Sequence, residues 1–171
     1  VLFSLMLLFF WASPLKAVTF NPNNIISDAE ILNSGAMTLD DIIGFLKSKN
    51  SYLAGYTAQD ALGNMRSAAE IIYNAAANNY DCDGVELSAN PTLAEKKQKC
   101  QPISINPQFL LVLLQKEQSL VTDDSPTQKQ LDWATGYAVC DSCSLSDPKV
   151  LKYKGFGSQV DNAAGIMRWY Y

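Results

Sequence analysis

The stretch from Asn106 to Val121 constrains the fold of this chain more than any other. Asn106 can accept hydrogen bonds from the free amides at a helix start, and Pro107 fits the first helical turn. The run Phe-Leu-Leu-Val-Leu-Leu at residues 109–114 is apolar on every side of a helix. A helix of this kind is stable only when other elements surround it. The sequence therefore predicts a buried central helix here.

The rest of the chain also has helical patterning. Thr38, followed by acids at 40 and 41, predicts a helix start, with an apolar stripe at 39, 42, 43 and 46. The order Ser-Ala-Ala-Glu at 67–70 has the form of a capping box, and it opens a helix that we expect to end near residues 78–79. Further helices are predicted near 93–99, after Pro126 and from Gly155 onward. With no visible repeat or linker, we expect an all-α fold with one helical domain, a buried central helix and a cleft.

Composition excludes several function classes. The chain has 13 Lys and Arg against 17 Asp and Glu, for a net charge of -4, and no cluster of basic residues. Because binding to phosphates needs such a cluster, nucleic acid is not an expected partner. There is no His, which excludes Ser-His-Asp and Cys-His catalysis and His-ligated zinc. Proton chemistry in this chain would have to use carboxylates, Tyr, Lys or Cys.

The first residues have the pattern of an export signal. Residues 1–11 are apolar except for Ser4, Pro14 breaks the run, and a cleavage site could follow Ala17. We expect a signal peptide at 1–17 whose start is missing, and one domain over 18–171. A buried N-terminal helix is the alternative reading. An uncleaved segment would be the only expected membrane contact, and the predicted location is secreted or in the cell envelope.

The four cysteines support export. Cys82 and Cys100 bracket a polar insert at 81–101, and Cys140 and Cys143 lie close together. In an oxidising compartment an even number predicts two disulfides, and of the three possible pairings the two local ones are favoured. A site with four Cys ligands to zinc is the alternative, although 82 and 100 are too far apart to form a short zinc knuckle. No metal is expected.

Glu117 is unusual in the predicted central helix, because it is a charged residue on an otherwise apolar face. Spacings of three and four place it on the same face as Leu110, Leu113 and Leu120. A carboxylate on an apolar stripe is costly to ionise and so tends to keep its proton, which suits a general acid. The alternative is that Glu117 has reached the exposed end of the helix, or pairs with Lys116.

Several segments together resemble a known superfamily. Residues 105–120, 134–137 (Ala-Thr-Gly-Tyr) and 155–164 (Gly-Phe-Gly-Ser-Gln-Val-Asp-Asn-Ala-Ala) resemble the lysozyme-like domain of secreted bacterial proteins. Residues 20–28 and 37–38 resemble the leader that precedes this domain in such proteins. These proteins are related to lytic transglycosylases and endo-β-N-acetylglucosaminidases. The resemblance implies a lysozyme-like fold in which Glu117 acts as the catalytic acid on peptidoglycan glycan strands. It also implies substrate-binding roles for Gly136, Tyr137, Tyr153, Phe156 and Gln159.

Cleavage of a glycosidic bond usually needs two carboxylates. Asp123 and Asp124, just beyond the central helix, are the candidates for the second one, with Asp132 and Asp141 as further possibilities. In the related transglycosylases the acetamido group of the substrate can replace it, so a single Glu suffices and no cofactor is implied. Gln118 departs from the Ser that commonly follows the Glu there. The rival function is a catalytically inactive cell-wall-binding or adhesion module.

Overall fold

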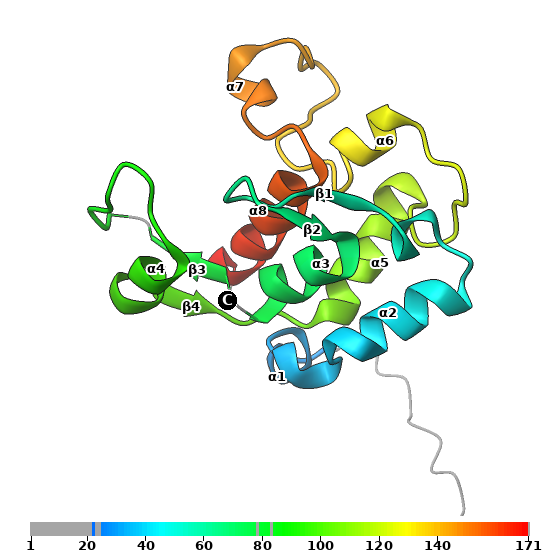
Figure 1. The fold of residues 1–171 in the computed structure, drawn as a ribbon, viewed down its shortest axis with the longest axis horizontal. Coiled ribbons are helices and arrows are strands. Elements are labelled where there is room, and N and C mark those ends of the chain that lie inside the picture. Colours follow the sequence, from blue (N-terminus) through cyan, green and yellow to red (C-terminus); the bar gives the residue numbers. More distant parts are fainter. Residues whose placement is uncertain (1–21, 23–24, 78, 83, 171) are drawn as a thin grey trace, which may run out of the picture.

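Helix α5 (Pro107–Gln118) forms where its sequence predicts in this computed structural model, which describes residues 22, 25–77, 79–82 and 84–170 (Figure 1). Asn106 caps it, accepting a hydrogen bond from the backbone amide of Gln108 at 2.8 Å. Leu110 and Leu114 are fully buried, but Val112 is 63% exposed. The expectation of a helix buried all round is therefore wrong, because one side of α5 faces solvent. The signal peptide predicted at 1–17 lies outside the described residues.

Helix α3 (Ala68–Ala77) is the centre of the core. It contacts α8 (Phe156–Trp169), α5 and α2 (Leu39–Ser48). Its predicted buried face is confirmed, since Ala68, Ile71, Ile72, Ala75 and Ala76 are all buried. Small alanine side chains let neighbouring helices approach closely, while the two isoleucines fill the space between them.

Capping fixes where the flanking helices begin. At α2, Thr38 Oγ1 accepts from the amide of Asp41, whose carboxylate accepts from the amide of Thr38 in return. The same reciprocal arrangement joins Ser67 to Glu70 before α3. Both capping residues were predicted from sequence and are confirmed. The remaining helical elements are α1 (Asp28–Ile31), η1 (Ser34–Ala36), η2 (Tyr52–Ala54), α4 (Leu93–Lys99), α6 (Gln128–Asp132) and α7 (Pro148–Leu151).

The prediction of an all-α, lysozyme-like fold is wrong, because the described residues also form two antiparallel two-stranded sheets. Strands β1 (Thr57–Gln59) and β2 (Met65–Ser67) pair around a tight turn, and β3 (Asn79–Asp81) pairs with β4 (Gln101–Ile103). Each strand has only three residues, too few for an alternating apolar pattern. In the first turn, Asp60 Oδ1 accepts from the amides of Leu62 and Asn64, which holds the hairpin closed.

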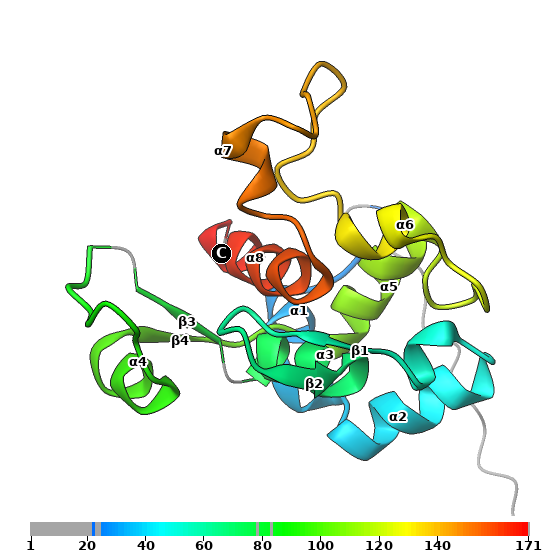
Figure 2. The same cartoon turned by 45° about the horizontal axis from the view of Figure 1, so that its top comes forward.

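The polar insert leaves and re-enters the core through β3 and β4, with α4 between them. Two parts of the chain project from the helical core in both views: this insert, and the loop that carries α7 (Figures 1 and 2). The hairpin of β1 and β2 lies against the start of α8. No helix among the described residues has the length and apolar character needed to cross a membrane.

Candidate functional site

Glu117 lies in the last turn of α5, on the face that carries Leu110 and Leu114. Both leucines are fully buried, whereas the Glu117 side chain retains 32% of its exposure, because α5 ends one residue later. Glu117 Oε1 accepts a hydrogen bond from Lys116 Nζ at 2.8 Å. The Lys116 side chain is 75% exposed, so this ion pair is at the surface. The structure thus agrees with the alternative reading: Glu117 shares a face with the buried leucines, but it lies at the exposed end of the helix and pairs with Lys116.

Gly136 borders the other carboxylate oxygen. Its φ is +68°, which favours glycine, and a Cβ built on it would lie 3.4 Å from Glu117 Oε2. Any larger residue would therefore be strained and would also crowd the carboxylate. The glycine turn and the end of α5 meet although 19 positions separate them in the sequence.

Gln159 holds this turn in place from inside the protein. Its side chain is fully buried, and its Oε1 accepts from the amides of Thr135 at 3.3 Å and Tyr137 at 3.0 Å. Its Nε2 donates to the carbonyl oxygens of Tyr137 at 3.1 Å and Tyr153 at 2.8 Å. One amide side chain therefore ties the glycine turn to the segment before α8. Sequence reasoning placed Gln159 toward the substrate, but the structure places it beneath the turn.

Tyr137 and Tyr153, both predicted to bind substrate, lie together. Their rings meet edge to face at 5.0 Å between centroids. Lys152 Nζ lies 4.6 Å from the centroid of Tyr153, and its hydrogen bond to Tyr153 raises the pKa of this exposed lysine. Both tyrosines are half-buried, so part of each remains accessible.

Phe156 is in the core, with only 2% exposure, and touches Tyr56 edge-on at 5.6 Å between centroids. Tyr56 itself was missed by sequence reasoning. Burial, followed by its proximity to Tyr52 and Asp132, raises the pKa of its hydroxyl, which also hydrogen-bonds with Gln128. No local pattern marks this residue, because its neighbours come from distant segments.

The carboxylates proposed as second groups have different environments. Asp123 accepts hydrogen bonds from the Ser125 amide at 2.9 Å and Gln130 Nε2 at 3.1 Å, which shapes the loop after α5. Asp124 and Asp141 are exposed on loops. Asp132 is largely buried and pairs with Lys154 at 3.2 Å.

Two hollows are present elsewhere on the described surface, and Glu117 lines neither. One, of about 690 Å³, lies among α3, α8, the β1–β2 turn and the insert. The other, of about 490 Å³, lies between α2 and α5 and is mostly apolar. Neither hollow is the cleft that the sequence predicted beside Glu117.

The cysteines form two disulfides, Cys82–Cys100 and Cys140–Cys143, which is the local pairing that the spacing favoured. Both bridges are consistent with a secreted protein. Within the described part of the chain, no group of three acidic, Cys or His side chains is placed to hold a metal ion.

Comparison with known families decides the relationship of this chain. Residues 64–171, more than half of the chain, match the family described as LasA, N-terminal domain. The chain belongs to this family. No curated protein and no solved structure matches it. The match to the LasA N-terminal domain begins at the β1–β2 turn and includes Glu117, Gly136 and Gln159.

This membership corrects the lysozyme-like assignment made from sequence. The LasA N-terminal domain is propeptide-like and is not a lysozyme-like catalytic domain. The residues that suggested the resemblance are an apolar helix ending in Glu, a glycine turn and a final helix. Such a combination arises wherever a buried helix reaches the surface beside a tight turn, so it does not identify a superfamily.

Proposed function

We propose that this protein binds the glycan strands of peptidoglycan across the end of α5 and cleaves them with Glu117 as the acid. The position of Glu117 supports this proposal: its side chain lies on the face of α5 that carries buried leucines, 32% of it remains exposed, and one of its oxygens lies beside Gly136. A general acid needs a carboxyl that is partly withdrawn from water yet reachable by the bond it protonates.

The surroundings of Glu117 are compatible with a sugar ligand. Lys116 pairs with Glu117 at the surface, where such pairs contribute at most about 1 kcal/mol, so a ligand can displace the lysine. Tyr137 follows Gly136 directly, and its ring packs edge to face with the ring of Tyr153. Aromatic side chains with a few polar groups are typical of ligand sites.

In this reaction Glu117 gives its proton to the bridging oxygen, and the bond from that oxygen to the anomeric carbon breaks. The positive charge that develops on the sugar is stabilised by the acetamido group of the substrate or by a loop carboxylate such as Asp124. Water, or a hydroxyl of the sugar itself, then attacks the anomeric carbon and returns a proton to Glu117. This route uses only one carboxyl group of the protein as acid and base.

A turbidity assay on purified peptidoglycan tests the proposal. Glu117→Gln keeps the size of the side chain but removes its acidic proton, so we expect the loss of cleavage with unchanged folding. Glu86→Gln, an exposed glutamate on the insert, is the matched control and should cleave as the unaltered protein does. Equal cleavage by Glu117→Gln and the unaltered protein would remove Glu117 from the mechanism.

A second candidate function is a non-catalytic domain that binds cell-wall glycan. The family match favours only the non-catalytic part of this candidate, because the LasA N-terminal domain is propeptide-like and is not a lysozyme-like catalytic domain, and the glycan ligand is our proposal. Co-sedimentation with insoluble peptidoglycan separates the two functions. Retention on peptidoglycan without any release of soluble fragments supports the binding domain, and fragment release supports the enzyme.

A further inference from the structure

The hollow of about 690 Å³ is formed where the polar insert folds back onto the core. Asn90, Pro91, Thr92, Leu93 and Lys96 of the insert form one wall. The opposite wall comes from the β1–β2 turn together with α3 and α8. The volume of the hollow is within the range of small-molecule binding sites.

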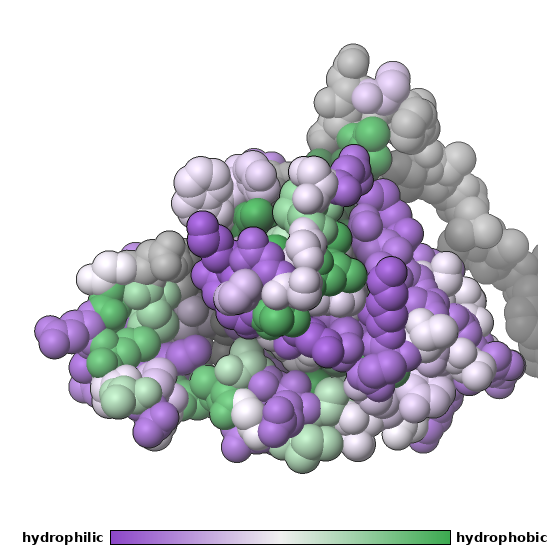
Figure 3. Space-filling model, turned by 90° about the horizontal axis from the view of Figure 1, so that it is seen from above, coloured by the Kyte–Doolittle hydropathy of each residue, from purple (hydrophilic) through white to green (hydrophobic). Residues whose placement is uncertain are grey.

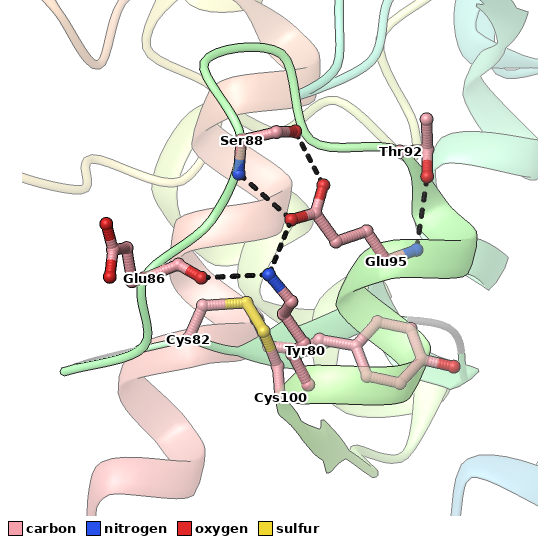
Figure 4. Close-up of a disulfide and its surroundings, with 8 residues drawn as sticks. Tyr80, Cys82, Glu86, Ser88, Thr92, Glu95 and Cys100 are labelled. Carbon is pink, nitrogen blue, oxygen red and sulfur yellow. Dashed lines mark hydrogen bonds and ion pairs between the residues drawn. A yellow bond between two sulfur atoms is a disulfide. The ribbon is translucent and has the colours of Figure 1, made fainter.

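The insert is held rigidly in this position. Cys82–Cys100 joins its two ends beside the β3–β4 pair, and Figure 4 shows the contacts inside it. Glu95 accepts from the amide of Ser88 at 2.9 Å, from its hydroxyl at 2.6 Å and from Lys99 Nζ at 3.0 Å. The hydrogen bonds from Ser88 chiefly lower the pKa of Glu95, to about 2, so this anchor stays charged. A wall that is already ordered loses little conformational entropy when a ligand binds.

The opposite wall is equally fixed. A Cβ added at Gly157 would overlap the backbone of Gln59 and Asp60, so the hairpin packs directly on the first turn of α8. Asp60 pairs with Arg66 at 3.2 Å, and Arg66 lies 3.8 Å from Glu70. The turn is therefore tied to β2 and α3.

The charged groups of the lining balance. Asp60 and Asp161 are acidic, and Arg66 and Lys96 are basic, so the hollow has no net charge and selects neither a strong anion nor a strong cation. Three asparagines and two hydroxyl side chains, at 64, 74, 90, 80 and 92, supply both donors and acceptors. Leu62 and Leu93, both partly exposed, add an apolar ledge. The insert forms the lobe at the left of Figure 3, where hydrophobic and hydrophilic side chains lie side by side.

We propose that this hollow binds a neutral, N-acetylated amino-sugar chain, separately from the site proposed at Glu117. Sugar hydroxyls and acetamido groups donate and accept together, which matches a lining of mixed and balanced polar groups, and acetyl methyl groups fit the apolar ledge. The choice of an amino sugar among neutral polar ligands rests on the proposed function.

Tetra-N-acetylchitotetraose is the probe, and Glu117→Gln protein is the background, so cleavage does not interfere. Binding is followed by NMR titration of backbone amides and by calorimetry. We expect amide shifts in residues 60–66 and 90–96, and about tenfold weaker binding after Lys96→Ala or Asn90→Ala. Lys97→Ala removes the same charge from the next position of α4, outside the lining, and should leave the affinity within about twofold.

The outcomes separate this inference from the proposed function. Absence of shifts around the hollow, or equal effects of the Lys96 and Lys97 substitutions, overturns the inference even if peptidoglycan is cleaved. Tighter binding of the fully deacetylated, cationic tetramer also overturns it, because the hollow would then be a cation site. Shifts around the hollow together with a loss that is specific to Lys96 and Asn90 support it, even if Glu117 proves inactive.

Discussion

Replacing Gln159 with Leu tests whether one buried amide maintains the turn beside Glu117. The substitution keeps approximately the same volume but removes every hydrogen-bonding atom of the side chain. Four backbone groups lose their partner: the amides of Thr135 and Tyr137, and the carbonyl oxygens of Tyr137 and Tyr153.

Each unsatisfied buried polar group destabilises a protein by about 1–3 kcal/mol. Water can reach some of these groups when the turn loosens, so we expect a total loss of about 4 kcal/mol, near the lower end of that range for four groups. For a domain of this size, such a loss corresponds to a decrease in Tm of about 10 °C. Because Gly136 is in the same turn, glycan cleavage should fall as well.

Urea denaturation followed by circular dichroism measures the free energy of unfolding. Asn162→Leu on the same helix is the matched control, because the Asn162 amide donates to the carbonyl of Ser158 within α8. We expect Asn162→Leu to change the free energy of unfolding by less than about 1 kcal/mol. If Gln159→Leu were as stable as the unaltered protein, or no less stable than Asn162→Leu, the account of the turn would be refuted.

Three further perturbations have defined outcomes. Burial raises the pKa of Asp161 from 3.8 to about 6, so ionising it in the folded protein should lower stability by about 2 kcal/mol as the pH rises from 4 to 7. Asp161→Asn should abolish this decrease, and a difference in denaturation midpoint between the two proteins that stays constant over this pH range would contradict the burial. Gly136→Ala should lower the free energy of unfolding by about 1–2 kcal/mol, because alanine is strained at a φ of +68°, and should reduce cleavage, because the added Cβ lies close to Glu117. Unchanged stability and cleavage in this variant would show that the turn relaxes without cost. Replacing Cys82 and Cys100 with Ser should lower the free energy of unfolding by about 3 kcal/mol, and replacing Cys140 and Cys143 with Ser should lower it by about 2 kcal/mol, because the second bridge closes a shorter loop. Thermal unfolding measures both losses, and a larger loss for the shorter bridge would mean that the insert is ordered without its disulfide.

The helices could be predicted because their signals are local. Asn106-Pro107, Thr38 and the capping box at Ser67 each fix a start within one turn, and regular apolar spacing then identifies the buried side of α3. The two local disulfides follow from spacing in the same way. Such features depend on residues that are close in sequence, so a single chain is sufficient to find them.

The strands and the site depended on distant partners. The β3 and β4 strands pair across 20 residues or more, and their three-residue sequences carry no apolar alternation. The resemblance implied a substrate-binding role for Gln159, but hydrogen bonds to residues 135, 137 and 153 hold its polar side chain in the core. Tyr56 meets Phe156 from 100 positions away. The family assignment failed for a related reason, since several short segments that are each determined locally were taken as evidence for a whole superfamily.

The central claim is that Glu117 donates a proton to a glycosidic bond. Mass spectrometry of the soluble fragments released from purified peptidoglycan tests it most directly. The account predicts disaccharide-containing fragments, with either a reducing or an anhydro end, from the unaltered protein and none from Glu117→Gln. Fragments of the same kind and amount from both proteins, or from neither, would contradict it.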